Sequence, residues 1–306
     1  MFFLSANPKT FFFAMMAALG FAMQDAVVKM LTVSGSLWQL MLIRSFFVVL
    51  LIIACAYFFN KTSVISPKSK FWPLARAFFM SGAYTLFYAS LPFVSVSEAS
   101  VCFFVAPAFV CLFAVILLGE KIGFWRLSSV FIGFVGVLIV IQPGFDDFKP
   151  VLFLPVAAGA SYALAVVITR GFCKNEPSFS LIIVHNLFYA LLGAFIVTFL
   201  TFIPFDAETV SVNPFLLSGW VESTKALMIL IGLTSLTHIL AMTSSIAAYQ
   251  NGEASLVAPL EYIYLIFALF LDFMIWDFIP SETQVLGSIT ITISGAIIAW
   301  REWHRS

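Results

Sequence analysis

The chain has 306 residues, of which 62% are hydrophobic and 10% are charged, and its mean hydropathy is +1.07. Soluble domains carry about 25% charged residues, so this composition excludes a soluble globular protein and indicates an integral membrane protein. The 15 basic and 15 acidic residues cancel, which leaves no basic surface for nucleic acid. We therefore expect the lipid bilayer as a partner and no nucleic acid.

Ten apolar stretches are long enough to cross a bilayer as helices. None of the connections between them is long enough to hold a soluble domain, so the predicted fold is all-α and polytopic. The stretches run Phe11–Val33, Ser36–Phe59, Phe71–Leu91, Val94–Gly119, Phe124–Gln142, Val151–Gly171, Phe179–Phe202, Thr224–Tyr249, Gly252–Met274 and Thr283–Trp300.

The positions of Lys and Arg predict the orientation. With the N-terminus in the cytoplasm, eleven basic residues fall at inner ends, and Lys149 and Lys225 are left at outer ends. Cytoplasmic loops carry an excess of Lys and Arg, so this distribution favours two cytoplasmic termini and an even number of helices. The eleven are Lys9, Lys61, Lys68, Lys70, Arg76, Lys121, Arg126, Arg170, Lys174, Arg301 and Arg305.

Weak internal similarity suggests a duplication. The sequence Glu-Ala-Ser at 98–100 recurs at 253–255, and Gly20 and Gly159 are each followed six residues later by Ala-Val-Val. Both matches keep the same order along the chain. Since five helices per unit is an odd number, the second unit would lie upside down in the membrane, an architecture that recurs among secondary transporters.

The predicted organisation is therefore two inverted five-helix repeats. We place the N-terminal repeat at residues 1–143 and the C-terminal repeat at 144–306. Gly133 and Gly136 in the fifth stretch, and Gly287 and Gly295 in the tenth, are expected to be points of close helix packing.

Glu261 is the strongest single candidate for a functional residue. It lies nine residues into its stretch, and at about 1.5 Å per residue this places it roughly 14 Å deep, near the middle of the membrane. A carboxylate at that depth usually faces a bundle interior or an aqueous cavity. The alternative is a protonated carboxyl that hydrogen-bonds a neighbour. Glu98 and Glu253, in first helical turns, fit a capping role instead.

Three further charges lie within predicted spans. Asp25 and Lys29 are four residues apart and can pair on one helix face, and Arg44 lies about 12 Å into its stretch. One interpretation is a purely structural salt bridge. The other is a network of Asp25, Lys29, Arg44 and Glu261 that gates or couples transport.

Polar and aromatic residues within the spans supply the remaining candidates for binding substrate. A tyrosine ring can bind a cation through its face while its hydroxyl finds a polar partner, and Tyr84 and Tyr88 share one helix face. Histidine and asparagine at this depth either bind substrate or bond a neighbouring helix. The predicted substrate-binding set is Glu261, Tyr262, Tyr84, Tyr88, Trp38, His238 and Asn186.

Several short motifs along the chain point to one family. They are Leu91-Pro92, Glu98-Ala99, Pro107, Leu118–Lys121, Gly133–Val137, Leu260–Tyr262, Gly287, Gly295 and Trp300–Glu302. Together they resemble the drug/metabolite transporter superfamily, and specifically its EamA-type ten-helix members. Asp25–Lys29, Arg44 and Glu261-Tyr262 are most similar to the branch of carboxylate, amino-acid and amine transporters. The resemblance implies a ten-helix carrier of a small organic solute, as relatives handle amino acids, vitamins, amines or S-adenosylmethionine.

The sequence lacks the common signatures of enzymes and ATP-driven pumps. We find no Gly-x-Ser-x-Gly elbow, no His-Glu-x-x-His pair, no phosphate-binding Gly-x-x-x-x-Gly-Lys-[Ser/Thr] loop and no Cys or His spacing that suits a metal. We therefore expect no catalytic residues, no metal and no cofactor.

The combined expectation is a secondary active transporter in the inner (cytoplasmic) membrane. Its substrate would be a small organic metabolite, either a zwitterionic or cationic amino acid, an amine or a solute like S-adenosylmethionine, moved by proton coupling or exchange as a monomer or homodimer. A membrane enzyme, or a passive lipid or ion pathway without a saturable site, is the alternative.

We predict that Glu261→Gln strongly reduces transport while leaving expression normal, because the amide cannot carry the charge. Uptake into liposomes containing the purified variant checks this. Wild-type uptake would remove Glu261 from the site.

Overall fold

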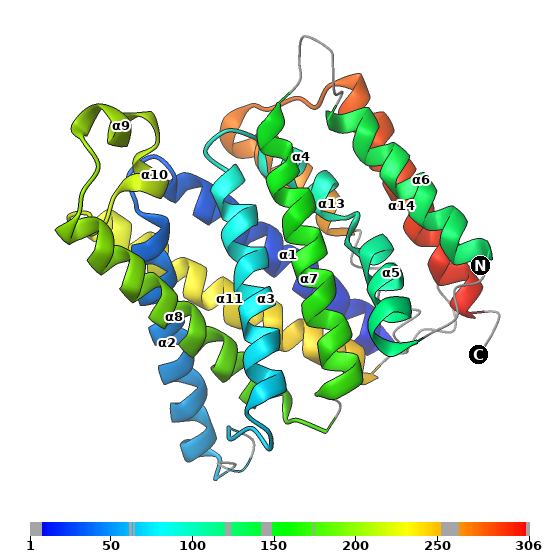
Figure 1. The fold of residues 1–306 in the computed structure, drawn as a ribbon, viewed down its shortest axis with the longest axis horizontal. Coiled ribbons are helices and arrows are strands. Elements are labelled where there is room, and N and C mark those ends of the chain that lie inside the picture. The colour runs from blue at the N-terminus through cyan, green and yellow to red at the C-terminus, as the bar shows by residue number, and fades with distance from the viewer. Residues whose placement is uncertain are drawn as a thin grey trace.

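The computed structural model describes residues 8–303 except 61–62, 64, 120–123, 142–148, 174 and 252–262. All regular structure in this described part is helical (Figure 1). The helices are α1 (Pro8–Leu31), α2 (Leu37–Phe58), α3 (Phe71–Ser90), α4 (Val96–Phe103), α5 (Ala106–Leu118), α6 (Phe124–Ile141), the 3-10 turn η2 (Pro150–Leu152), α7 (Phe153–Phe172), α8 (Ser178–Phe202), α9 (Ala207–Val212), α10 (Pro214–Leu217), α11 (Lys225–Asn251), α13 (Ile263–Trp276) and α14 (Glu282–Trp303).

The helices agree with the predicted membrane stretches. Each of the ten predicted stretches contains a helix, and six segments are long and apolar enough to cross a membrane. The chain is therefore a multi-pass membrane protein. The full count of ten spans and the side on which the termini lie remain predictions.

One predicted span is interrupted. The stretch Val94–Gly119 forms two helices, α4 and α5, separated by a turn at Phe104 and Val105. Pro107 has no N–H to give to the carbonyl of Phe103, which explains why the helix breaks there. A Cβ atom on Gly159 of α7 would lie 2.7 Å from the Phe103 oxygen, so α7 can approach this break only because residue 159 is glycine.

The connection between α8 and α11 contains two short helices that the sequence did not predict. Asp206 caps α9 and Asn213 caps α10, each with a side-chain oxygen that accepts a backbone N–H. Phe215 of α10 is fully buried. The Ser36 hydroxyl and the Trp38 indole donate to the carbonyls of Ser218 and Leu216, so this connection is tied to the start of α2.

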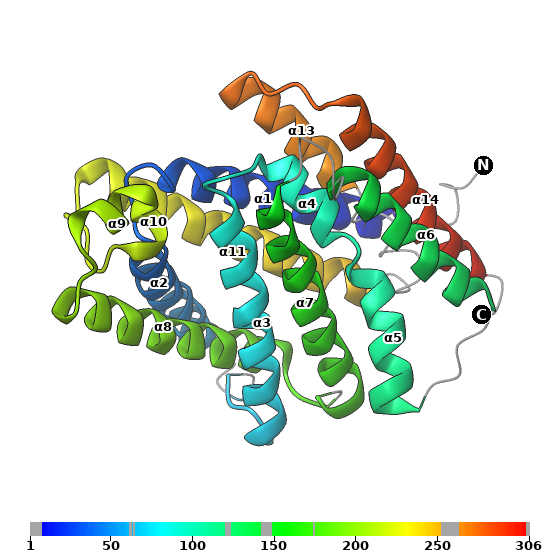
Figure 2. The same cartoon turned by 45° about the horizontal axis from the view of Figure 1, so that its top comes forward.

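Four helix pairs organise the bundle. Helix α1 packs along α11, α3 along α7, α2 along α8, and α6 along α14. Figures 1 and 2 show α2 and α8 at one side of the molecule and α6 and α14 at the other, with α1, α3, α7 and α11 between them.

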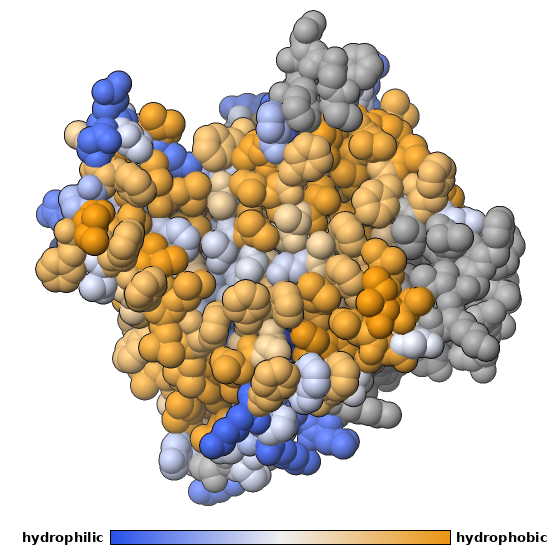
Figure 3. Space-filling model, viewed as in Figure 1, coloured by the Kyte–Doolittle hydropathy of each residue, from blue (hydrophilic) through white to orange (hydrophobic). Residues whose placement is uncertain are grey.

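The outer surface of the bundle is apolar. Phenylalanines on different helices are exposed, including Phe46 at 60%, Phe131 at 71% and Phe195 at 69%. In Figure 3 a hydrophobic surface crosses the middle of the molecule, and hydrophilic residues gather toward two ends. Exposed apolar area of this extent suits contact with lipid.

Helices α6 and α14 approach closely through glycines, as the sequence predicted. A Cβ atom on Gly136 would lie 2.7 Å from the side chain of Ile291 and 3.1 Å from the Gly287 carbonyl. A Cβ atom on Gly287 would overlap Val140. A Cβ atom on Gly133 would lie 3.1 Å from the Ser294 hydroxyl, whereas the surroundings of Gly295 lie outside the described part of the structure.

The loop after α7 is tied to the loop before α3 through Glu176. Its carboxylate accepts hydrogen bonds from the backbone N–H groups of Lys68 at 2.6 Å and Ser69 at 2.7 Å. Desolvation acts to raise the pKa of Glu176, but these hydrogen bonds outweigh it and hold that pKa below its usual value. The tie is therefore formed at neutral pH.

The α6–α14 contact predicts unequal effects of one substitution at two glycines. Gly287→Ala should destabilise the protein by about 1–3 kcal/mol because the added methyl overlaps Val140. Gly232→Ala on α11 is the matched control, since a Cβ there meets nothing within 4 Å, and it should be neutral or slightly stabilising. Thermal unfolding in detergent measures both. Equal melting temperatures for the two variants would contradict the packing described.

Candidate functional site

Asp25 lies at the centre of the bundle and accepts hydrogen bonds from three side chains. Its Oδ2 accepts from the Tyr264 hydroxyl at 2.8 Å, and its Oδ1 accepts from the Tyr88 hydroxyl and the Gln24 amide, each at 3.3 Å. All three partners are donors. This arrangement suits an ionised carboxylate, which only accepts hydrogen bonds.

Arg44 on α2 supplies the opposite charge. It is completely buried, and its Nη1 donates to the Tyr88 hydroxyl at 3.1 Å. Tyr88 thus accepts from Arg44 and donates to Asp25, so a single hydroxyl links the two charged groups by hydrogen bonds; we call this link the relay. The Nε and Nη2 atoms of Arg44 have no hydrogen-bond partner in the described part of the chain.

Aromatic rings enclose the guanidinium. Its carbon lies 5.4 Å from the ring centre of Tyr84, 5.6 Å from that of Tyr88 and 5.3 Å from that of Tyr189. Tyrosine ring faces attract a cation, and the attraction grows when water is excluded. These rings make a buried arginine tolerable without a direct salt bridge.

His238 on α11 joins the cluster through Gln24. Its Nδ1 lies 2.8 Å from the Gln24 Oε1. Because the Gln24 amide nitrogen already donates to Tyr88 and Asp25, its oxygen is left to accept, which assigns the proton of His238 to Nδ1. The Nε2 of His238 then carries a free lone pair, and it has no partner among the described residues.

His185 and Asn186 on α8 add further polar atoms. The ring of His185 stacks against Tyr84 and Tyr189, and its Nδ1 lies 3.3 Å from the Ser81 hydroxyl. The Asn186 amide nitrogen donates to the Ile182 carbonyl of its own helix. His185 Nε2 and Asn186 Oδ1 are buried, and neither has a partner within the described ranges.

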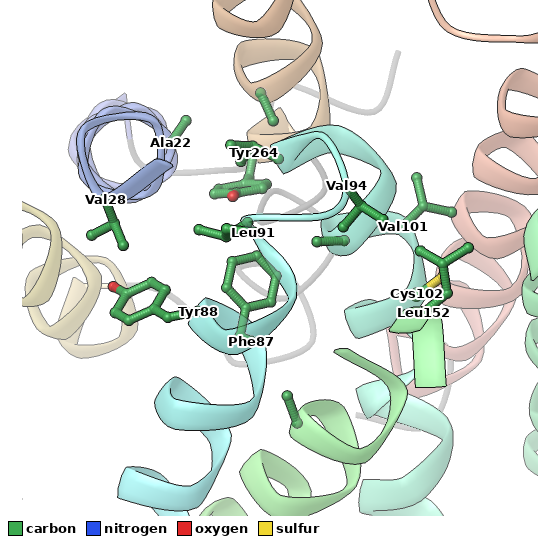
Figure 4. Packing of buried hydrophobic residues seen from close by; sticks show 14 of the residues in the cluster. Ala22, Val28, Phe87, Tyr88, Leu91, Val94, Val101, Cys102, Leu152 and Tyr264 are labelled. Atoms are coloured by element: carbon green, nitrogen blue, oxygen red, sulfur yellow. The ribbon is translucent and has the colours of Figure 1, made fainter. Parts of the chain in front are cut away.

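We call this group the central polar cluster. Buried polar atoms in proteins are normally satisfied by protein, water or ligand, so a cluster with several unmatched donors and acceptors suits a binding site. Figure 4 shows two of its members within the surrounding core, with Leu91 between Tyr264 and the rings of Tyr88 and Phe87. The cluster consists of Gln24, Asp25, Arg44, Tyr84, Tyr88, His185, Tyr189, His238 and Tyr264.

The structure brings together five of the residues that the sequence singled out, namely Asp25, Arg44, Tyr84, Tyr88 and His238. Asn186 lies beside His185 in the chain. Gln24, Tyr189, Tyr264 and His185 were not in the predicted set. Gln24 could have been found as the polar neighbour of Asp25, and the other three as polar aromatic residues within predicted spans. Only the packing of α8 and α13 against α1 and α3 shows that they join this cluster.

Other predicted residues lie elsewhere. The spacing suggested that Lys29 pairs with Asp25, but it does not. Lys29 donates instead to the carbonyls of Leu91 at 3.0 Å and Val94 at 2.5 Å. The Trp38 indole donates to the Leu216 carbonyl of α10, in the connection before α11. Glu261 and Tyr262 lie outside the described residues, so their place in the site remains a prediction.

A groove of about 340 Å³ lies near α2 and α11, away from these polar groups. Its walls are apolar, and two of them, Phe46 and Phe47, face the lipid surface. This chemistry suits an acyl chain rather than a polar solute, so we do not assign the groove as the substrate site. Its lining residues are Leu42, Ile43, Phe46, Phe47, Trp220, Ser223 and Met228.

Comparisons with known proteins agree with the expected class. Residues 8–142 match the EamA-like transporter family. An S-adenosylmethionine uptake transporter of Rickettsia bellii is 23% identical over 278 residues, which cover 91% of this chain and 89% of that protein. Solute carrier family 35 member G1 of Mus musculus is 25% identical over 272 residues, which cover 83% of this chain and 68% of that protein.

A solved crystal structure has the same fold. It superposes with a TM-score of 0.63 and 14% sequence identity, and the match covers 95% of this chain and 96% of that one. This structural match shows the fold alone. The resemblance to EamA-type transporters is confirmed by the family match over residues 8–142 and by the two relatives named above.

The relay through Tyr88 predicts a loss of stability in Tyr88→Phe. The ring would remain against Arg44, but Arg44 would lose its only hydrogen-bond acceptor among the described residues. Asp25 would lose one of its three donors. We expect a loss of about 1–3 kcal/mol, measured by thermal unfolding in detergent. Tyr57→Phe is the matched control because Tyr57 is 65% exposed. An unchanged melting temperature for Tyr88→Phe would exclude the relay.

Proposed function

Because residues 8–142 form an EamA-like transporter domain, we propose that this multi-pass membrane protein is a secondary carrier for a small zwitterionic or cationic metabolite. The solute would be an amino acid, an amine or a molecule like S-adenosylmethionine. The observation that carries the proposal is the buried pair of opposite charges, Arg44 and Asp25, held apart by one tyrosine hydroxyl.

Arg44 is the proposed binding site for a carboxylate. Placing a guanidinium in a membrane bundle is costly, and structural roles are usually met by pairing it with an acid. Here the guanidinium keeps two nitrogens without partners in the described part of the chain. A planar carboxylate can accept two parallel hydrogen bonds from a guanidinium, which makes it the best-matched ligand group.

Asp25 is the proposed counter-charge for the cationic part of the solute. An ammonium or sulfonium group that approaches Asp25 would compete with the hydroxyls of Tyr88 and Tyr264, which are its present donors. Displacing Tyr88 from Asp25 would also loosen its bond to Arg44. Binding of a zwitterion would in this way change the contacts of α1, α2, α3 and α13 together.

The rings of the cluster would recognise the rest of the solute. The ring centre of Tyr84 lies 5.5 Å from the ring centre of His185 and 6.0 Å from that of His238, so the Tyr84 ring adjoins both histidines. Aromatic surfaces of this kind hold planar or cationic groups through stacking and through their ring faces. The lone pair of His238 Nε2 can accept a hydrogen bond from a donor on the solute.

Helix packing supports the proposed inverted repeats, residues 1–143 and 144–306. If α1, α2, α3 and α6 correspond to α7, α8, α11 and α14, exchanging the halves converts the α1–α11 pair into the α7–α3 pair. The same exchange leaves the α2–α8 and α6–α14 pairs unchanged. All four pairs occur. Two units that can adopt exchanged conformations would open a central site alternately to the two sides.

We place the carrier in the inner membrane with both termini in the cytoplasm, on the distribution of Lys and Arg. Coupling to protons or to exchange would supply the driving force, with Glu261 as an additional candidate for coupling. A membrane enzyme or a passive pathway is the competing class.

Counterflow distinguishes these classes. Liposomes that contain the purified protein are preloaded with unlabelled S-adenosylmethionine, and uptake of the labelled compound is followed, with parallel runs for amino acids and amines. A carrier gives a transient, saturable overshoot. Unsaturable flux would indicate a passive pathway, and a chemically altered product would indicate an enzyme.

Arg44→Lys tests the site directly. Lysine keeps the charge but cannot form the two parallel hydrogen bonds, so we expect at least roughly tenfold slower counterflow of the solute that the parent protein transports. Arg76→Lys is the matched control, since Arg76 donates its hydrogen bonds to Thr169 and the Leu181 carbonyl rather than to a side chain of the cluster, and its variant should retain most activity. Full activity of Arg44→Lys would remove Arg44 from the site.

A further inference from the structure

A second group of charged side chains joins the two halves of the chain at one end of the bundle. Helix α4, the C-terminal end of α13 and the N-terminal end of α14 lie together there in Figures 1 and 2. The distribution of Lys and Arg predicts that this end faces the outside. We call the group the outer latch; its side chains are Lys29, Glu98, Lys149, Asp272 and Gln284.

Asp272 of α13 holds the N-terminus of α4. Its Oδ1 accepts from the Val96 N–H at 3.3 Å and its Oδ2 accepts from the Ser97 N–H at 2.7 Å. Asp272 lies two residues before the end of the predicted stretch Gly252–Met274, where a solvated acid at the membrane interface would be the simplest expectation, but it is only 1% exposed. A carboxylate at the positive end of a helix explains how the charge can be buried.

Glu98 completes the cap of α4 and reaches both neighbouring segments. Its Oε2 accepts from the Ser95 N–H, and the Ser95 hydroxyl accepts from the Glu98 N–H, which confirms the predicted capping role. Its Oε1 accepts from Lys149 at 2.9 Å and from the Gln284 amide at 2.7 Å. With Asp272, this satisfies the first four N–H groups of the α4 segment.

Lys29 closes the group from the side of α1. Besides donating to Leu91 and Val94, its ammonium lies 5.6 Å from the ring centre of Trp276, which follows Asp272 by one helical turn. The latch therefore contains two lysines and two acids, and its charges balance while it is closed.

Most latch contacts cross between the two proposed repeats. Asp272, Gln284 and Lys149 belong to the second half of the chain, and they bind α4 of the first half. If the halves rock against each other, as the proposed function requires, these contacts must separate when the outer end opens. Water can then hydrogen-bond the freed N–H groups and charged side chains, so these groups would have hydrogen-bond partners in both the closed and the open state.

We propose that the outer latch is the outer gate of the carrier, and that Asp272 and Lys29 must release α4 and the α3–α4 turn in each cycle. This inference rests on the proposed function for its role in transport. The closed latch itself is independent of which solute is carried.

Thiol labelling measures the opening. Ser97, which is 2% exposed beneath Asp272, is replaced by cysteine after the four native cysteines are changed to serine. A membrane-impermeant methanethiosulfonate reagent is then added from outside. We expect slow labelling of this parent. Adding Asp272→Asn should speed labelling roughly tenfold to a hundredfold. The substitution removes hydrogen bonds to a charged group, and their contribution to the closed state corresponds to a fold-change of that size.

Asp277→Asn is the matched control. Asp277 lies five residues further on, is exposed, and takes no part in the latch, so its variant should label as slowly as the parent. Lys29→Met provides a second opening variant in case Asp272→Asn fails to fold. Labelling that stays slow in every folded latch variant, or is equally fast in Asp277→Asn, would overturn the latch.

Cross-linking tests the role in transport. Cysteines at positions 98 and 284, whose native side chains hydrogen-bond each other across the two halves, are joined by a short disulfide-containing methanethiosulfonate linker. Counterflow of S-adenosylmethionine, or of whichever panel solute the parent carries, should stop and return on reduction. Undiminished counterflow in the linked protein would refute the gate. Faster labelling without any saturable transport would refute the carrier while leaving the latch.

Discussion

The charge of Arg44 is the constraint on which the centre of this molecule depends. A guanidinium deep in a membrane bundle needs compensation, and the fold supplies it with three tyrosine rings and one hydroxyl that leads to Asp25. The helices that carry these groups must therefore come together. Because compensation is indirect, part of the guanidinium keeps its hydrogen-bonding capacity, which distinguishes this site from a structural salt bridge.

The charged residues of the membrane region fall into two groups with different chemistry. The central polar cluster contains one acid and one base separated by aromatic groups, and several of its polar atoms have no partner within the described ranges. In the outer latch the acids instead accept hydrogen bonds from backbone N–H groups, from Lys149 and from Gln284. The unmatched polar atoms of the central polar cluster suit a ligand that binds and leaves. The paired groups of the outer latch suit a contact between helices that is either closed or broken.

Close helix packing connects the two groups. Helix α1 carries Asp25 in the cluster and Lys29 in the latch, one helical turn apart, and α13 carries Tyr264 and Asp272, about two turns apart. Both helices are rigid elements, so a shift of either one alters both groups. The break between α4 and α5 separates the short helix α4, which the latch holds, from the rest of its predicted span.

The sequence alone determined the class and the helices and singled out several residues of the central polar cluster, because a bilayer imposes a length and a polarity on every span and makes each buried charge conspicuous. Asp25, Arg44, Tyr88 and the capping role of Glu98 could be identified in this way. The partners could not, since they depend on which helix faces which. Lys29 bonding two carbonyls, Asp272 capping a distant helix, and Tyr264 and Gln24 joining Asp25 are contacts between segments far apart in the chain. Only the tertiary structure decided them.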